Sequence, residues 1–139
     1  ERGVLQTWLL DSASARQLGL APTGHAARGV GGSPGVTTSN LFMQAGHVPV
    51  ATLIEDITTG VYVTELIGQG VNGVTGDYSR GAAGFLIEDG QITRPIAEFT
   101  IAGNLRDMFR ALVPANDLEF RQGINVPTLR IDGMTVAGG

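Results

Sequence analysis

Apolar and polar side chains alternate along several short segments of the chain, which is the pattern of half-buried β-strands. Residues 61–68 show this alternation, and residues 84–96 show it on both sides of Asp89-Gly90, a dipeptide typical of a two-residue type I′ hairpin turn. Residues 4–10 are expected to form a buried strand, and residues 40–46 another. These segments predict a protein built mainly from antiparallel strands.

The return strand of the predicted hairpin is expected to be irregular. Pro95 has no N–H to donate, so it favours an edge position or a bulge. The inward-facing side chains also change parity, from Ile92 and Ile96 to Phe99 and Ile101. One inserted residue, as in a β-bulge, accounts for this change.

One helix is expected over residues 49–60. Pro49 suits the first helical position, and Gly60 is placed for a C-terminal cap. The apolar residues recur at helical spacing, so we expect a single buried face formed by Val50, Leu53, Ile54 and Ile57.

Two further helices are expected, over residues 12–19 and 104–112. Asp11 and Asn104 are suited to cap their N-termini, and Gly19 is suited to end the first of them. The core stripe of the second is expected to comprise Leu105, Met108, Phe109 and Leu112. The chain is therefore predicted to be α+β, with two or three short helices, and residues 1–139 have the size of a single domain.

Composition narrows the classes of function. The chain has no cysteine and no lysine, which excludes disulfides, thiolate metal sites and Schiff-base chemistry. Its nine basic residues are scattered arginines and its net charge is −4, so we expect no nucleic-acid partner. No apolar run approaches the length of a membrane span, so we expect no membrane partner. Glycine is abundant: 21 of the 139 residues are glycine, which is about twice the average usage of about 7%. This abundance indicates many turns, bulges and close backbone contacts.

Gly68, Gly70 and Gly73 form a G-x-G-x-x-G match after a predicted strand, and Glu88 follows at the distance of a ribose-binding acid. A dinucleotide site also needs a helix directly after the glycines. The following residues contain three more glycines within nine positions, so they do not favour a helix. The match is interpreted as strand bends and close crossings, and no cofactor is expected.

Catalytic and metal-binding signals are weak. His25 and His47 are the only histidines, and neither has a second ligand at metal-binding spacing. A polar cluster at Asp77, Tyr78, Ser79 and Arg80 lies between glycines. The simplest interpretation is that Asp77 caps a turn and Arg80 pairs with a carboxylate, whereas the alternative is contact with a partner or a peptide.

A long segment without periodicity, residues 21–40, carries His25 and Arg28 and is the second candidate contact region. A stand-alone hydrolase that uses Asp77, Ser79 and His25 is the alternative to a contact surface. A homo-oligomeric binding module is a further alternative. The sequence does not decide whether the chain is itself an enzyme, and no catalytic residue is assigned.

The segments "TGDYSRGAAGF" and "TIAGNL", with "SARQLGLAPTGHA" before them and "PTLRIDGMTVAGG" after them, resemble the C-terminal region of the TldD/PmbA family. The similarity is greater to the PmbA branch, also called TldE and historically labelled modulators of DNA gyrase. It covers nearly the whole chain. Family members are much longer, so the chain resembles a fragment of a longer protein.

The resemblance implies a glycine-rich, barrel-like domain, either an open barrel or a two-sheet sandwich, and a role in cytoplasmic peptide maturation and degradation. It also implies a TldD-like partner subunit that carries zinc on a His-Glu-x-x-x-His helix. This chain has no His-Glu pair, so no metal, cofactor or catalytic residue is carried over. The expected function is a non-catalytic subunit domain that contributes partner surface and a wall of the peptide cavity.

Overall fold

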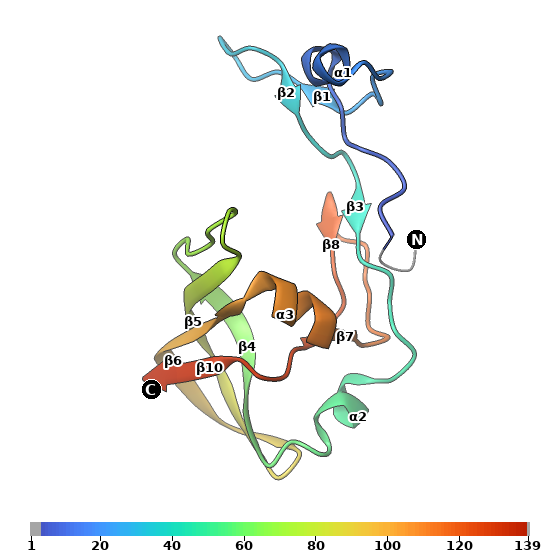
Figure 1. The fold of residues 1–139 in the computed structure, drawn as a ribbon. Coiled ribbons are helices and arrows are strands. Elements are labelled where there is room, and N and C mark those ends of the chain that lie inside the picture. Colours follow the sequence, from blue (N-terminus) through green and yellow to red (C-terminus); the bar gives the residue numbers. More distant parts are fainter. Residues whose placement is uncertain (1–3, 139) are drawn as a thin grey trace. The chain divides into compact units, whose positions relative to one another are not determined.

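The computed structural model describes residues 4–138 of the chain (Figure 1). They form two compact units, one from Glu1–Phe42 with Phe120–Asn125 and one from Met43–Glu119 with Val126–Gly139. The expectation of a single domain over residues 1–139 stays a prediction. The strands are mostly antiparallel and three short helices accompany them, which confirms the α+β class. Strands pair in several separate sheets, and none of the sheets in residues 4–138 closes into a barrel.

The first unit contains helix α1 (Ser12–Leu18), which begins and ends as expected. Asp11 Oδ1 accepts a hydrogen bond from Ser14 N at 2.7 Å, and Gly19 ends the helix in the left-handed conformation with φ 67°. The predicted strand over residues 4–10 is wrong, because these residues pair with no strand in the described part of the chain. Their apolar side chains are largely exposed, and only Leu10 is buried.

The first unit also contains two short strand pairs. Strands β1 (Ala26–Ala27) and β2 (Gly35–Val36) are antiparallel, so the long segment 21–40 contains a small hairpin. Strands β3 (Leu41–Phe42) and β8 (Ile124–Asn125) are parallel, and β3 lies within the strand expected over residues 40–46. The rings of Phe42 and Phe120 meet edge to face with centroids 5.3 Å apart.

The second unit is built on a four-stranded antiparallel sheet in the order β10-β6-β5-β4 (Figure 1). Its strands are β4 (Thr59–Ile67), β5 (Asp77–Glu88), β6 (Gln91–Asn104) and β10 (Thr135–Gly138). The turn between β5 and β6 is the predicted Asp89-Gly90 pair, with φ 48° and 76° as a type I′ turn requires.

Strand β6 contains the predicted insertion. The pairing passes from Ala82–Phe99 to Gly84–Ile96, so one extra residue lies on β6, where Glu98 has φ 59°. A second register shift follows beside Pro95. Pro95 is tolerated there because β10 pairs with β6 only over Phe99–Ala102, which leaves that side of β6 open at Pro95.

The core of the sheet lies on one face, around Phe99, Ile101 and Ala82. It is completed by the partly buried residues Val61, Val63, Tyr78, Ile96 and Met134. Small residues allow the strands to approach closely, since a Cβ at Gly84 would overlap the carbonyl oxygen of Tyr62. The glycine content of β5 therefore serves strand packing.

Two helices and one more strand pair complete this unit. Helix α2 (Val50–Ile54) is shorter than predicted, because the chain leaves it at Glu55, and Gly60 lies in β4 instead of in a cap. Helix α3 (Leu105–Ala111) begins at Asn104 as predicted, with Asn104 Oδ1 accepting from Arg106 N at 3.1 Å. Strands β7 (Val113–Pro114) and β9 (Leu129–Arg130) pair antiparallel.

The predicted buried faces of these two helices are only partly correct. Leu53 of α2 is buried, and Val50, Ile54 and Ile57 are half-buried. Phe109 of α3 is 67% exposed, and no residue of α3 is fully buried. The stripe on α3 was inferred from spacing alone, and residues 4–138 cover only part of that face.

Candidate functional site

The outer edge of β4 borders a cavity with a volume of about 1080 Å³. β4 is the last strand in the sheet order, so one of its edges is unpaired within the sheet. The cavity is lined by every residue from Ile57 to Leu66. Successive strand residues point to opposite faces, so a cavity lined by all of them must follow the edge of the strand. We call it the β4 groove.

The alternation of the ladder identifies the backbone groups at that edge. Asp89 N donates to Thr58 O at 3.0 Å, and Thr59 lies opposite Glu88. In an antiparallel pair, Gly60 and Tyr62 therefore direct their backbone N–H and C=O groups to β5. The corresponding groups of Val61 and Val63 point into the β4 groove.

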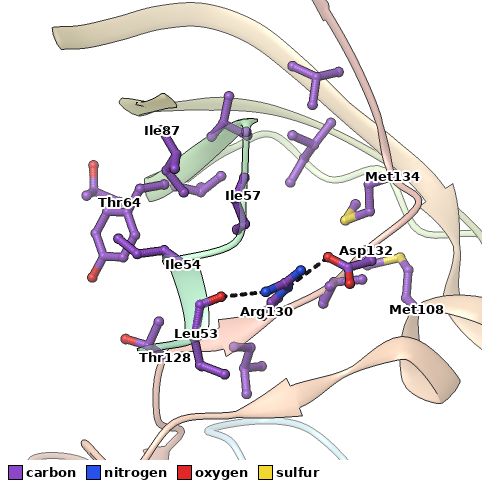
Figure 2. A pocket seen from close by; sticks show the side chains of 18 of the residues that line it. Leu53, Ile54, Ile57, Thr64, Ile87, Met108, Thr128, Arg130, Asp132 and Met134 are labelled. Atoms are coloured by element: carbon purple, nitrogen blue, oxygen red, sulfur yellow. Dashed lines mark hydrogen bonds and ion pairs between the residues drawn. The ribbon is translucent and has the colours of Figure 1, made fainter. Parts of the chain in front are cut away.

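The walls of the groove are mainly apolar. Figure 2 shows Leu53, Ile54 and Ile57 on one side and Met108 and Met134 on another. Ile87 of the sheet also faces this space. The polar lining consists of threonines, the tyrosines Tyr62 and Tyr78, Glu65, and Arg130 with Asp132. An extended chain with apolar side chains fits such a groove.

Arg130 holds one wall of the groove in place. Its Nη1 donates to Leu53 O at 2.7 Å, and its Nε donates to Asp132 Oδ1 at 2.9 Å (Figure 2). The guanidinium also forms an ion pair with Asp56. The hydrogen bond from Arg130 lowers the pKa of Asp56, and the two carboxylates raise the pKa of Arg130.

Sequence reasoning did not identify Arg130. Its partners Leu53 and Asp56 lie more than 70 residues away, and nothing in the local pattern connects them. The only local signal is Asp132, two positions further along an extended segment and therefore on the same side of the chain. That spacing is too common to identify a site.

The predicted polar cluster Asp77–Arg80 is divided between the two faces of β5. Asp77 begins β5, and its carboxylate accepts from Thr75 Oγ1 at 2.6 Å and from Asn104 Nδ2 at 3.4 Å. The turn before it is capped by Asn72 instead, whose Oδ1 accepts from Val74 N and Thr75 N. Tyr78 packs against the core and lines the β4 groove. Ser79 is exposed and belongs to the second unit, whereas His25 belongs to the first.

Arg80 differs from its expected structural role. Its guanidinium pairs with no carboxylate of residues 4–138, and its Nη2 donates instead to Leu66 O at 3.3 Å. The expected ion pair is therefore not formed within these residues. Ile67 and the residues after it run beside Arg80, so the backbone of β4 is the nearest acceptor.

His25 and Arg28 lie in the first unit. His25 Nδ1 is 2.9 Å from Thr23 Oγ1, and Arg28 Nε donates to Gly32 O at 3.0 Å within the β1–β2 hairpin. The structure therefore shows a local hydrogen bond for each of them. In the part of the chain that the structure describes, no group of three or more histidine or acidic side chains is arranged to hold a metal ion.

The G-x-G-x-x-G segment is a loop that leads into β5, without the helix of a dinucleotide site. Gly70 lies against the backbone of β5, where a Cβ would overlap Ser79 O. This contact confirms the interpretation of the motif as a close crossing. No helix within residues 4–138 combines the length and the hydropathy needed to cross a membrane.

Comparison with known proteins agrees with this architecture. The model of the PmbA/TldA metallopeptidase C-terminal domain matches residues 1–138. This chain belongs to the PmbA/TldD family. It is 46% identical over 137 residues to metalloprotease PmbA of Escherichia coli O157:H7, and 44% identical over 140 residues to a PmbA homolog of Haemophilus influenzae.

Solved structures in the PmbA/TldD family share the fold. A protein of Thermotoga maritima, named as a modulator of DNA gyrase, matches 99% of this chain and 32% of its own with TM-score 0.81 and 33% identity. TldE of Thermococcus kodakarensis matches 99% of this chain and 33% of its own with TM-score 0.85; at 23% identity, it supports the fold alone. The matches cover 98% and 99% of this chain but only 28% and 29% of the two PmbA relatives.

Proposed function

We propose that this chain is a non-catalytic PmbA/TldE-type subunit domain of a two-component peptidase. In this proposal a TldD-like subunit carries the zinc and the hydrolytic chemistry, and the assembly works in the cytoplasm on peptides. Membership of a metallopeptidase family supports the peptidase system. A contribution by contact instead of by catalysis is supported by Asp77, whose carboxylate is already engaged by the side chains of Thr75 and Asn104.

The observation that carries the proposal is the unpaired edge of β4 along an apolar groove. Val61 and Val63 present backbone groups there that pair with no strand of residues 4–138, which is the arrangement that accepts an extended peptide as an additional strand. Main-chain hydrogen bonds supply affinity with little dependence on sequence, and the apolar walls hold alternate side chains. Such an edge suits a domain that holds many different peptides for a separate catalytic subunit.

The test uses the complete protein and its TldD-like partner, and measures both partner capture and cleavage of a casein-derived peptide mixture. We expect the pair to cleave peptides that neither subunit cleaves alone. Val61→Pro removes one N–H at the groove edge, and Val61→Ala is the matched control for the lost side chain. Val61→Pro is expected to reduce cleavage by at least about fivefold relative to Val61→Ala.

Three results would contradict the proposal. The first is cleavage by this protein without the partner, especially if Ser79→Ala or His25→Ala abolished it. The second is failure to capture the partner. The third is equal cleavage by the Val61→Pro and Val61→Ala proteins, which would show that the N–H of Val61 at the β4 edge does not contribute to cleavage. The homo-oligomeric alternative stays a separate prediction, which the mass of the protein in solution decides.

A further inference from the structure

The guanidinium group of Arg80 contains a buried N–H that forms no hydrogen bond within residues 4–138. Its Nε is shielded from solvent and has no hydrogen-bond partner in residues 4–138, while Nη2 of the same guanidinium donates to Leu66 O. Buried N–H groups are nearly always hydrogen-bonded, because leaving one unpaired forfeits its interaction with water. The hydrogen-bonding capacity of the Arg80 guanidinium is therefore only partly used within the described residues.

Beside Arg80 lies a second cavity of about 290 Å³. Its other lining residues are Gly68, Gln69, Gly70 and Val71, which form the loop that follows β4. Two of these four residues have no side chain, so main chain forms much of the wall. Gly68 has φ 76°, and Gly70 cannot carry a Cβ because Ser79 O occupies that space. We call this space the Arg80 cavity.

The loop that lines the Arg80 cavity follows the last residues of β4 that line the β4 groove. Arg80 is paired in register with Ile101, and cross-strand partners point to the same face of a sheet. Ile101 lines the β4 groove, and Leu66, whose carbonyl oxygen accepts from Arg80, is the last β4 residue that does so. A chain lying along β4 therefore ends beside the loop that lines the Arg80 cavity.

We propose that the Arg80 cavity binds the C-terminal carboxylate of a peptide that lies along β4, an inference that rests on the proposed function. A carboxylate is the acceptor that a guanidinium binds most strongly, and terminal carboxylates are commonly held by backbone loops of this kind. The peptide runs parallel to β4, because its C-terminus then lies beside the end of β4. Arg80 thus fixes both the direction and the register of the peptide.

Titration calorimetry on the complete protein tests this inference with two probes, N-acetyl-tetra-alanine with a free carboxylate and the same peptide as its C-terminal amide. The free acid is expected to bind at least about tenfold more tightly, as a charge-assisted hydrogen bond implies. Arg80→Gln is expected to abolish this preference. Arg94→Gln, at an exposed arginine of β6, is the matched control and is expected to keep it.

Equal affinities for the two probes overturn the inference, as does no measurable binding of either. If Arg80→Gln does not fold, the comparison of the two peptides on the unaltered protein decides alone. Displacement of the acid by acetate at concentrations similar to that of the peptide would assign the cavity to free carboxylates and overturn the peptide assignment. Partner capture by the unaltered protein, measured separately, distinguishes the two proposals, because equal affinities for the two probes with capture retained overturn this inference alone.

Discussion

Arg130 donates a hydrogen bond from Nη1 to the backbone carbonyl oxygen of Leu53 at 2.7 Å. This bond joins the end of α2 to strand β9, so two segments far apart in the sequence form one wall of the β4 groove. The same guanidinium binds Asp56 and Asp132. One wall of the groove is therefore joined by a single side chain, which contacts the backbone of one residue and the carboxylates of two others.

Arg130→Met is expected to lower the free energy of unfolding by about 1–2 kcal/mol, because it leaves the Leu53 carbonyl oxygen and two carboxylates without their donor. Urea denaturation measures this loss. Arg110→Met is the matched control, because Arg110 pairs with Asp107 at 3.6 Å on the surface of α3, with both side chains largely exposed. Its effect is expected to stay within about 0.5 kcal/mol. Equal losses in the two variants would show that Arg130 does not organise the groove wall.

Acidification is expected to destabilise the same region. The pKa of Asp56 is lowered by Arg130, and the pKa of Asp117 is lowered by its hydrogen bond from Thr128 Oγ1. A folded-state pKa below the unfolded-state value means that the unfolded chain binds more protons in acid. The stabilisation is therefore complete above the unfolded-state pKa of about 4 and is lost as the pH falls through the lower folded-state values.

Urea denaturation of the wild type, Asp56→Asn and Asp117→Asn proteins at pH 7 and at successively lower pH values measures this dependence. Each variant is expected to be less stable than the wild type at pH 7 and to lose less stability in acid. The assignment fails for any aspartate whose asparagine variant loses as much stability on acidification as the wild type.

Close backbone packing predicts an effect of a single methyl group. In Gly70→Ala the new Cβ would overlap Ser79 O, so the loop or β5 must move, and we expect a loss of roughly 1–3 kcal/mol in the free energy of unfolding. Gly73→Ala, three residues along the same loop, meets no atom within 4 Å and is expected to change stability by less than about 0.5 kcal/mol. A neutral Gly70→Ala variant would contradict the close crossing. Thermal unfolding of both variants measures the difference.

The local features of the fold could be predicted from sequence because they depend on nearby residues. The turn at Asp89-Gly90, the cap at Asn104 and the insertion revealed by the parity change before Phe99 all follow from patterns within a few positions. The strand expected over residues 4–10 failed for the opposite reason. Its alternation was correct for a strand, but no partner strand in the described chain pairs with it.

The groove could not be predicted because it depends on the order of strands in the sheet. Nothing local shows that β4 is at an edge, or that Arg130 reaches Leu53 from β9. The contact of Arg80 with Leu66 O could not be predicted either, because it depends on how β4 pairs with β5. A glycine-flanked arginine suggested an ion pair, whereas the fold places Leu66 O beside it.

Amide hydrogen exchange along β4 tests the central claim most directly. Exchange is measured at Val61, Tyr62 and Val63 in the complete protein, with and without the TldD-like partner and a bound peptide. The account predicts at least about tenfold slower exchange at Val61 and Val63 once a peptide pairs with the edge. Tyr62 N–H, already bonded to β5, is the internal control and should change little. Unchanged exchange at Val61 and Val63 in the peptide-bound assembly would contradict strand addition at β4.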